Sequence, residues 1–574
     1  MEIDTLKSSA LDWLTDVFDA DTQKEVQEVL NGPQEELTDR FYKDLEFGTG
    51  GMRGMMGVGT NRINKYTLGK ATQGLVNYMK LNCPNEDLKV AIAYDCRHNS
   101  DTFAKIVADV LTANGVKVFL FDALRPTPEL SFAVRYFACT AGIVLTASHN
   151  PPEYNGYKVY WKDGGQIVPP QDAGIIEQVK ALHFSDINFK GQDALIQEIG
   201  KEVDQAFIEG SIANTCGTIQ GRDDLKIVFT SLHGTAVKLV PDTLNAAGYS
   251  DVHCVEEQNE PDGSFPTVKS PNPEEPEALS MAVALADRIG ADIVLGTDPD
   301  ADRIGVAVRN LKGELVLLNG NQSMAVMSSF LIKNWKNQGR IDGKQFMGST
   351  IVSSDLVNKI GSSNGVEVKI GLTGFKWIAK MIKDHSDLDF IGGGEESFGF
   401  MVGDFVRDKD AVSAALLACE IAADAKSKGS SFYQELLELY IKHGFYKERL
   451  ISLVKKGMDG AEQISNMMRD LRANPLTELD GSKVTRLCDY QSGYETDLIT
   501  GEKHEMNLPA SNVLIFHTED GSKIAARPSG TEPKIKFYFS VRGPLSDINL
   551  VTLVESELDQ KIDRIISEMN LLDE

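Results

Sequence analysis

Apolar positions along the chain follow two alternating patterns, one typical of helices and one typical of short buried strands. Asn99 and Ser100 are interpreted as a helix cap, and the segment 101–114 carries an apolar helical face before Gly115 and an apolar run over 116–121. That face holds Phe103, Ile106, Val107, Val110 and Leu111. The same order of helix, glycine and strand recurs around Gly248, Gly290 and Gly365. Alternating helices and strands predict α/β layers with mostly parallel sheets, repeated as several domains.

The pattern changes near the C-terminus, where apolar and polar residues alternate as in a half-exposed antiparallel strand. Ile535, Phe537, Phe539 and Val541 alternate with Lys536, Tyr538 and Ser540. An amphipathic helix follows, so the last part is predicted to be a smaller α+β domain. Boundaries near 205, 315 and 430 define four domains: 1–205, 206–315, 316–430 and 431–574. The proline-rich stretch 260–278 is interpreted as an excursion within the second domain.

Composition and charge narrow the class of protein. The chain has 574 residues, with 84 acidic and 58 basic side chains and a net charge of −26. This balance disfavours binding to nucleic acid or to anionic membranes, so the positive field for an anionic substrate has to be local. We expect a cytoplasmic protein for three reasons. The cysteines are scattered without a CxxC pair, the N-terminus is unlike a signal peptide, and the sequence has no long apolar run. The sequence does not distinguish a monomer from a small homo-oligomer.

A carboxylate-rich segment, "VLGTDPDADRIGVAV", follows an apolar strand and contains Asp298, Asp300 and Asp302. Alternate residues of an extended segment point the same way, so the three carboxylates are predicted to converge on one hard cation. A calcium EF-hand needs glycine at its sixth position and glutamate at its twelfth, where this chain has Arg303 and Arg309. Mg²⁺ with open positions for a phosphate fits better, and an acidic surface turn is the alternative.

Two further loops offer groups for binding a phosphorylated sugar. In "DFIGGGEESFGF", Glu395 and Ser397 suit sugar hydroxyls, and a glycine-rich turn with solvated acids is the alternative. In "ARPSGTEPK", Arg527 is suited to bidentate phosphate binding, and a simple hairpin turn is the alternative. Other donors to that phosphate are Ser529, Gly530 and Thr531. The chain has no Walker motif, so ATP as phosphoryl donor is unsupported.

The stretch "LTASHNPPEYNGYKVY" places Ser148 and His149 on a loop stiffened by two prolines, with Lys158 further along. Rigid loops after strands commonly carry chemistry. Ser148 lacks the GxSxG context of a hydrolase, and the neighbouring motifs favour phosphoryl over acyl transfer. His149 taken alone suits a structural role, but beside Ser148 and together with the other loops it is a candidate site residue. Lys158 is suited to place positive charge near a transferring phosphoryl group.

Four motifs in this order, "TASHNP", "GTDPDADR", "GEESFG" and "RPSGTEPK", resemble the α-D-phosphohexomutases, the family of phosphoglucomutases and phosphomannomutases. The resemblance runs from "FGTGGMRG" at 47–54 over nearly the whole remaining chain. It implies a heart-shaped, four-domain architecture: three similar α/β domains with mixed sheets and a smaller C-terminal α+β domain, with one loop from each at a central cleft. Phe398 stands where many mannomutase-like members have glycine, and "LTGFKW" at 372–377 resembles the glucomutase branch, which includes phosphopentomutases.

The resemblance also implies roles for individual residues. Ser148 is the residue that becomes phosphorylated, and it holds Mg²⁺ together with Asp298, Asp300 and Asp302. The other catalytic residues are Arg53, His149, Lys158 and Lys409. Substrate binding falls to Arg303, Thr373, Gly374, Glu395, Ser397, Arg527, Ser529, Gly530 and Thr531.

These features predict an isomerase, a phosphosugar mutase that interconverts glucose 1-phosphate and glucose 6-phosphate. Phosphorylated Ser148 gives its phosphoryl group to the substrate and recovers another from glucose 1,6-bisphosphate, which also serves as activator or primer. Phosphomannomutase and phosphopentomutase activities are the alternatives on the same scaffold. A metal-dependent phosphosugar phosphatase and a non-catalytic sugar-phosphate sensor are less well supported, the sensor because it needs no nucleophile.

Overall fold

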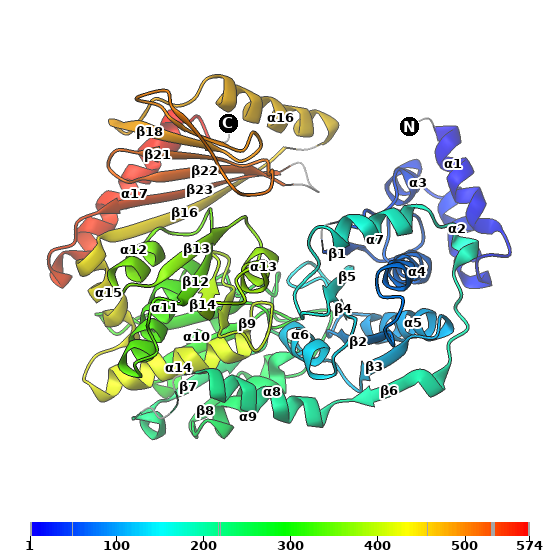
Figure 1. Ribbon diagram of the computed structural model, residues 1–574, viewed down its shortest axis with the longest axis horizontal. Coiled ribbons are helices and arrows are strands. Elements are labelled where there is room, and N and C mark those ends of the chain that lie inside the picture. The colour runs from blue at the N-terminus through cyan, green and yellow to red at the C-terminus, as the bar shows by residue number, and fades with distance from the viewer. Residues whose placement is uncertain are drawn as a thin grey trace. The chain divides into compact units, whose positions relative to one another are not determined.

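Two units make up the chain in the computed structural model shown in Figure 1. Unit 1 comprises Met1–Gly320 and Phe375–Gly429, and unit 2 comprises Asn321–Gly374 and Ser430–Glu574. The structure describes residues 3–48, 50–215, 217, 220–455, 457–529 and 534–571, without the side chains of 457–459. Each unit therefore combines two separate stretches of the sequence.

An aromatic cluster holds the first helices of unit 1 in place. These helices are α1 (Ile3–Leu11), α2 (Ala20–Asn31) and α3 (Gln34–Phe41). Trp13 is 2% exposed, stacks on Phe18 with ring centroids 4.5 Å apart, and contacts Tyr66 edge-on. Tyr66 belongs to α4 (Lys65–Asn82), which packs on the first sheet. The N-terminal helices are thus anchored to the first α/β layer through buried aromatic contacts.

The first sheet of unit 1 is mixed and has the strand order β1-β5-β4-β2-β3-β6. Its strands are β1 (Gly51–Met55), β2 (Lys89–Tyr94), β3 (Lys117–Phe121), β4 (Ala141–Leu145), β5 (Tyr154–Trp161) and β6 (Ile196–Ile199). β2, β3, β4 and β6 run parallel, whereas β5 is antiparallel to β4 and β1. The covering helices are α4, α5 (Ser100–Ala113), α6 (Thr127–Tyr136) and α7 (Gln171–Lys180). α5 and β3 confirm the predicted helix and strand on either side of Gly115.

A second mixed sheet of unit 1 has the order β11-β10-β9-β7-β8. Its strands are β7 (Ile227–Thr230), β8 (Val252–Cys254), β9 (Ile293–Thr297), β10 (Ile304–Arg309) and β11 (Leu315–Leu318). The helices around it are α8 (Lys201–Asn214), α9 (Ala236–Ala246), α10 (Ser280–Ile289) and α14 (Ala411–Ser427). Unit 1 also contains α13 (Lys376–Asp384) and the antiparallel pair β14 (Asp389–Gly394) and β15 (Phe400–Val402). This arrangement brings the loops after β4, β9 and β14 into one unit.

Unit 2 combines a parallel strand pair with an antiparallel sheet. The pair is β12 (Gln345–Thr350) and β13 (Glu367–Gly371), accompanied by α11 (Gly320–Asn337), α12 (Leu356–Ser363) and α15 (Phe432–His443). The sheet order is β16-β23-β22-β21-β18-β19-β20, and β17 pairs with β18. Its strands are β16 (Phe445–Val454), β17 (Glu478–Leu479), β18 (Ser482–Asp489), β19 (Tyr494–Asp497), β20 (Lys503–Glu505), β21 (Leu514–Thr518), β22 (Lys523–Pro528) and β23 (Lys534–Gly543). Two further helices are α16 (Gly457–Ala473) and α17 (Val551–Glu568). The predicted C-terminal α+β character is confirmed.

One expectation for β23 is wrong. The strand is antiparallel to β16 and β22 as predicted, and Phe537 and Val541 are buried. Tyr538 and Ser540, expected on an exposed face, are only 8% and 7% exposed. The alternation identifies which residues share a face, but it does not show whether other elements cover the polar face.

Left-handed backbone conformations occur in three loops of unit 1 at residues that are not glycine. The φ angles are 53° at Ser148, 55° at Ala301 and 64° at Phe398. Glycine populates this conformation without a steric penalty, whereas each of these three residues carries a side chain. Each such residue strains the backbone by roughly 1–2 kcal/mol, and strain of this kind tends to cluster at functional sites.

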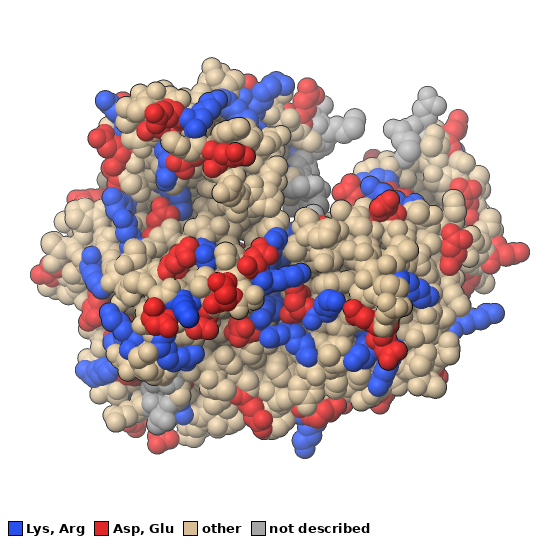
Figure 2. All heavy atoms as spheres, viewed as in Figure 1, with Lys and Arg blue, Asp and Glu red and all other residues tan. Residues whose placement is uncertain are grey.

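Two surface properties complete the description. Acidic and basic side chains are interspersed over the face drawn in Figure 2. Within the described part of the chain, no helix has both the length and the apolar character needed to cross a bilayer.

Candidate active site

The connection between β4 and β5 holds Ser148 against the aspartate loop that follows β9. The Ser148 hydroxyl is 3% exposed and donates a hydrogen bond of 2.7 Å to Asp298 Oδ2. His149 Nδ1 lies 3.2 Å from the same hydroxyl oxygen. Two residues that are 150 positions apart in sequence are thus joined directly. The sequence predicted both loops, and the structure brings them together.

A buried arginine holds this serine loop in shape. Arg97 is 3% exposed and lies 3.4 Å from Asp95. Its guanidinium donates hydrogen bonds to four backbone carbonyls, those of Ser148, Asn150, Pro151 and Tyr154. Sequence reasoning missed this residue, although "YDCRHNS" offers a signal: an aspartate and an arginine two positions apart after a buried strand. The rigidity of the loop therefore comes from Arg97 as well as from its prolines.

Three carboxylates converge on one point, as the sequence predicts. Asp298, Asp300 and Asp302 are at most 1% exposed, and one oxygen from each lies within 4.8 Å of the others. Asp298 Oδ1 accepts hydrogen bonds from the backbone N–H groups of Asp302 and Arg303. By contrast, Oδ1 of Asp300 and Oδ1 of Asp302 are buried and have no hydrogen-bond partner among the described residues. Buried carboxylate oxygens with no donor fit a hard cation such as Mg²⁺.

Two lysines partly neutralise the carboxylates. Lys158 Nζ lies 2.6 Å from Asp300 Oδ2 and 3.0 Å from Asp302 Oδ2, and Lys409 Nζ lies 2.8 Å from the same Asp302 oxygen. Burial opposes the charged form of Lys158, but the two carboxylates raise its pKa above the ordinary value. The pKa of Asp298 is raised well above its usual range by burial and by the other two carboxylates. Both lysines are therefore protonated and available to a phosphate.

A tyrosine on the strand of Lys158 holds Lys409 in place indirectly. Tyr160, which is fully buried, donates a hydrogen bond of 2.6 Å to Asp408 Oδ2. The other oxygen of Asp408 accepts a 2.9 Å hydrogen bond from the backbone N–H of Lys409 and lies 3.5 Å from its Nζ. Because β5 carries both Lys158 and Tyr160, this strand fixes the positions of both lysines. Sequence reasoning did not identify Tyr160 or Asp408.

The loop between β14 and β15 reaches the same lysine. Glu395 is 5% exposed, and a Cβ atom on Gly399 would lie 2.6 Å from Lys409 Cδ and 3.0 Å from Glu395 Oε1. Glycine at 399 therefore allows Glu395 and Lys409 to approach each other. Burial raises the pKa of Glu395 to about 7, against the opposing effect of Lys409. Ser397 lies on this loop and is half-buried.

The remaining unit 1 residues of the predicted site lie around the same cluster. Arg53 donates a 2.8 Å hydrogen bond to the side chain of Asn150 in the serine loop. Arg303 forms an ion pair with Glu274. Burial, together with the positive charges of Arg303 and Arg53, lowers the pKa of His149 well below its ordinary value. The imidazole beside Ser148 is therefore neutral.

The other predicted substrate-binding residues belong to unit 2. Thr373 and Gly374 follow β13, with Gly374 at a φ of 110° and the Thr373 hydroxyl buried without a hydrogen-bond partner. Arg527 lies on β22, and the backbone N–H of Ser529 donates a 2.7 Å hydrogen bond to the carbonyl of Lys534. Gly530 and Thr531 lie outside the described residues.

Three family models match successive parts of the chain. They describe domains I, II and III of phosphoglucomutase/phosphomannomutase, all α/β/α, and they match residues 44–186, 205–313 and 319–440. A phosphoglucomutase of Staphylococcus epidermidis is 39% identical over 545 residues, which covers 94% of this chain and 96% of that protein. A phosphoglucomutase of Staphylococcus aureus is 40% identical over 519 residues, covering 89% and 92%.

Solved structures share the fold. A putative phosphomannomutase from Thermus thermophilus superposes with a TM-score of 0.66 at 21% identity, covering 91% of this chain and 99% of that one. The open form of the Paramecium phosphoglucomutase parafusin superposes with a TM-score of 0.67 at 18% identity, covering 92% and 95%. The predicted architecture of three α/β domains with mixed sheets and a sheet-rich C-terminal domain is thereby confirmed.

Proposed function

We propose that this chain, which belongs to the phosphoglucomutase/phosphomannomutase family, interconverts glucose 1-phosphate and glucose 6-phosphate. The observation that carries the proposal is the 2.7 Å hydrogen bond between the Ser148 hydroxyl and Asp298 inside the carboxylate cluster. A serine in that position, flanked by two lysines, suits a phosphoryl carrier. The names of the Staphylococcus relatives support glucose as the sugar.

The proposed reaction consists of two transfers. Phosphorylated Ser148 gives its phosphoryl group to the 6-hydroxyl of glucose 1-phosphate, so the bond between Ser148 Oγ and phosphorus breaks, an ester bond to the sugar oxygen forms, and the proton of the sugar hydroxyl is balanced by protonation of Ser148 Oγ. The resulting glucose 1,6-bisphosphate turns over within the site. The bond between its 1-oxygen and phosphorus then breaks as the phosphoryl group passes to Ser148 Oγ, the serine hydroxyl loses its proton, the sugar oxygen takes one up, and glucose 6-phosphate is released. If glucose 1,6-bisphosphate escapes, it leaves Ser148 without a phosphoryl group. Glucose 1,6-bisphosphate that binds again would phosphorylate Ser148, which makes this compound the primer.

The basic residues of unit 1 supply the charge stabilisation that the transfers need. Lys158 and Lys409, already beside the carboxylates, would bind the oxygens of the transferring group. Mg²⁺ held by Asp298, Asp300 and Asp302 would offset the negative charge of the phosphoryl group. Arg97 positions the Ser148 backbone, and the neutral His149 is placed to share a proton with the serine hydroxyl.

Recognition of the sugar and of the second phosphate falls to other loops in this proposal. Glu395 and Ser397 would bind sugar hydroxyls, and Arg303 and Arg53 would contact the ligand. In unit 2, the residues proposed for the non-transferring phosphate and the sugar are Thr373, Gly374, Arg527, Ser529, Gly530 and Thr531. The proposal also includes the cytoplasmic location that the sequence predicts.

The reaction type is tested by incubating purified protein with glucose 1-phosphate, Mg²⁺ and a trace of glucose 1,6-bisphosphate. A mutase forms glucose 6-phosphate without releasing inorganic phosphate. Stoichiometric release of inorganic phosphate would instead establish a phosphatase. If neither product forms although the sugar phosphate binds, the protein is a sensor and the proposal is wrong.

The sugar is tested by comparing glucose, mannose and ribose 1-phosphates. Glucose and mannose differ only at carbon 2, and we identify no residue that is dedicated to binding the 2-hydroxyl. We therefore expect a preference for glucose with measurable turnover of mannose 1-phosphate. Glu395→Ala should reduce kcat/KM for the hexoses more than for ribose 1-phosphate, since a smaller ring places its hydroxyls differently. If ribose 1-phosphate is the best substrate of the wild-type enzyme, the hexose assignment fails and the mutase chemistry remains.

A further inference from the structure

Three basic side chains lie side by side across the antiparallel sheet of unit 2. Lys523 of β22 is the direct cross-strand partner of His517 on β21, and His517 is the direct partner of Arg486 on β18. Direct partners point to the same face of a sheet, and like charges placed opposite each other are destabilising. We call these three residues the basic ladder. The strand register places these basic groups next to one another, which is unfavourable unless negative charges lie nearby.

The two outer members of the ladder have carboxylate partners, but the central one does not. Lys523 is 5% exposed and contacts Asp355 Oδ1 at 2.8 Å, and Arg486 lies 3.5 Å from Glu495 Oε2. Among the described residues, the ring nitrogens of His517 have no hydrogen-bond partner. Burial and the charges of Arg486 and Lys523 lower the pKa of His517 to about 3. The centre of the ladder therefore lies in a positive field that the carboxylate of Asp355 offsets only in part.

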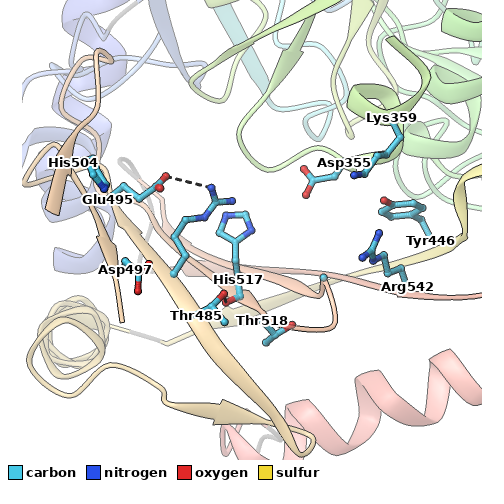
Figure 3. Close-up of a pocket in the computed structure, with 12 residues that line it drawn as sticks. Asp355, Lys359, Tyr446, Thr485, Glu495, Asp497, His504, His517, Thr518 and Arg542 are labelled. Atoms are coloured by element: carbon cyan, nitrogen blue, oxygen red, sulfur yellow. Dashed lines mark hydrogen bonds and ion pairs between the residues drawn. The ribbon is translucent and has the colours of Figure 1, made fainter. Parts of the chain in front are cut away.

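A cavity of about 380 Å³ opens over the ladder, and two more cations line it. Figure 3 shows Lys359 and Arg542 on one side of the cavity and His517 on the other. Neither Lys359 nor Arg542 has a carboxylate within 4.0 Å in the part of the chain that the structure describes. The Arg542 Nε–H donates to the backbone carbonyl of Asp520, and the guanidinium also interacts with the side chain of Tyr446.

The acidic residues of the cavity are already engaged. Asp355 is paired with Lys523, and Glu495 with Arg486. Asp497 Oδ1 accepts hydrogen bonds from the backbone N–H groups of Ile499 and Thr500, and these bonds hold its carboxylate within the turn. Lys359 and Arg542 are therefore the lysine and arginine of the lining that have no carboxylate partner among the described residues.

We propose that this cavity is a second phosphate-binding site, which takes the phosphate group of a small phosphorylated metabolite between His517, Lys359 and Arg542. Its volume lies within the range of pockets that hold small molecules. Arginine and lysine donors that lack a partner are the groups that bind phosphate oxygens most strongly. A bound phosphate would also compensate the charge at the centre of the basic ladder.

The site is separate from the phosphate grip proposed at Arg527. Lys523 and Arg527 lie four residues apart on β22, which corresponds to about 13 Å along a strand. Arg527 is not among the residues that line the cavity. The inference does not rest on the proposed mutase activity, because it uses only residues of unit 2 that have no assigned part in the reaction.

Equilibrium dialysis of the full-length protein with ³²P-labelled inorganic phosphate tests the proposal. We expect the wild-type protein to bind phosphate at this site, and Arg542→Gln and Lys359→Gln each to weaken that binding by about tenfold or more. Arg527→Ala should keep the binding at this site. Turnover of glucose 1-phosphate should be unchanged in Arg542→Gln and Lys359→Gln, so failure here is distinct from failure of the mutase assignment.

Lys442→Gln is the matched control, since it removes an exposed lysine of unit 2 outside the cavity and should bind phosphate as the wild type does. Melting temperatures show whether each variant is folded, and Lys359→Gln on the surface of α12 decides the question if Arg542→Gln does not fold. Unchanged phosphate binding in Lys359→Gln would overturn the proposal. So would the loss of all phosphate binding in Arg527→Ala.

Discussion

The serine–aspartate cluster of unit 1 and the basic ladder of unit 2 both concentrate charge, but they arrange it in opposite ways. In the cluster, Lys158 and Lys409 contact carboxylate oxygens at 2.6–3.0 Å, so each positive group has a negative neighbour. In the ladder, His517 lies between Lys523 and Arg486, and its ring nitrogens have no hydrogen-bond partner among the described residues. In the cluster both lysines have carboxylate partners before any ligand binds, whereas Lys359 and Arg542, which line the cavity at the ladder, have none among the described residues. Compensation suits a site where charge moves during a reaction, whereas a net positive field suits simple binding of an anion.

The two regions also differ in how their residues are held. Ser148 and Ala301 occupy left-handed backbone conformations in loops, and Arg97 binds the carbonyls of the serine loop. His517 and Arg486 lie on regular strands whose register alone fixes their spacing. Strained loops that are held by many contacts from neighbouring residues orient reacting groups accurately. Residues on regular strands are held by the register of the sheet and do not need such contacts.

The largest effect should come from Ser148→Ala, which tests whether the compensated cluster is the reacting centre. We expect turnover of glucose 1-phosphate to fall by several orders of magnitude, because the variant removes the proposed covalent carrier. Intact mass should show a fraction of wild-type protein heavier by one phosphoryl group and none of the variant. Ser427→Ala, at an exposed serine of the same unit, is the control and should leave both readouts unchanged. Wild-type turnover in Ser148→Ala would contradict the assignment.

Asp300→Asn should have the next largest effect, because it weakens a carboxylate that contacts Lys158 and has a buried, unpartnered Oδ1. We expect the Mg²⁺ concentration for half-maximal turnover to rise by roughly tenfold or more, with kcat reduced. A Mg²⁺ titration of activity measures this shift. The control is Asp287→Asn, at an aspartate whose side chain is 58% exposed. An unchanged Mg²⁺ requirement in folded Asp300→Asn would show that the carboxylates do not hold the metal.

Arg527→Ala compared with Arg486→Gln separates the two phosphate sites proposed in unit 2. A bidentate contact to phosphate contributes about 1.5–3 kcal/mol, so Arg527→Ala should raise KM for glucose 1-phosphate by roughly 10- to 100-fold. Arg486→Gln changes the basic ladder and should leave KM unchanged. Steady-state kinetics of both variants decide the matter. If Arg486→Gln raised KM as much as Arg527→Ala, the ladder would belong to the substrate site.

Tyr160→Phe tests whether the Asp408 contact positions Lys409. Removing the hydroxyl leaves a buried carboxylate oxygen unpaired, which costs about 1–3 kcal/mol. We expect kcat to fall by about tenfold with little change in KM. The control is Tyr157→Phe on the same strand, whose hydroxyl accepts from Thr72 at 3.2 Å in the core. That variant should lower the melting temperature without lowering kcat, and equal kcat values for both variants would assign Tyr160 a structural role only.

The smallest effect should come from Ala301→Gly, which relieves backbone strain beside the carboxylates. An alanine at a φ of 55° is strained by roughly 1–2 kcal/mol, and glycine increases the entropy of the unfolded chain by about 0.4–1 kcal/mol. We therefore expect a slightly higher melting temperature. Ala307→Gly on β10 lacks this strain and should lower the melting temperature. A lower melting temperature in Ala301→Gly would show that the strain is not relieved by glycine.

Local sequence patterns were enough to predict the alternation of helices and strands, the family and the loops that carry the chemistry. These features are local: helical and strand periodicity and short motifs depend on residues a few positions apart. The convergence of Asp298, Asp300 and Asp302 is of this kind, because alternate residues of one extended segment share a side. The serine loop was likewise recognisable, since its histidine and prolines are contiguous with Ser148.

The residues that support those loops from a distance, and the covering of polar faces, became evident from the folded arrangement of the chain. Arg97 lies 51 positions from Ser148, and Tyr160 lies 248 positions from Asp408. The basic ladder depends on strand register, and the burial of Tyr538 and Ser540 depends on what covers the second face of the sheet. Neither follows from periodicity, because alternation shows which side chains share a face and leaves open what lies opposite that face.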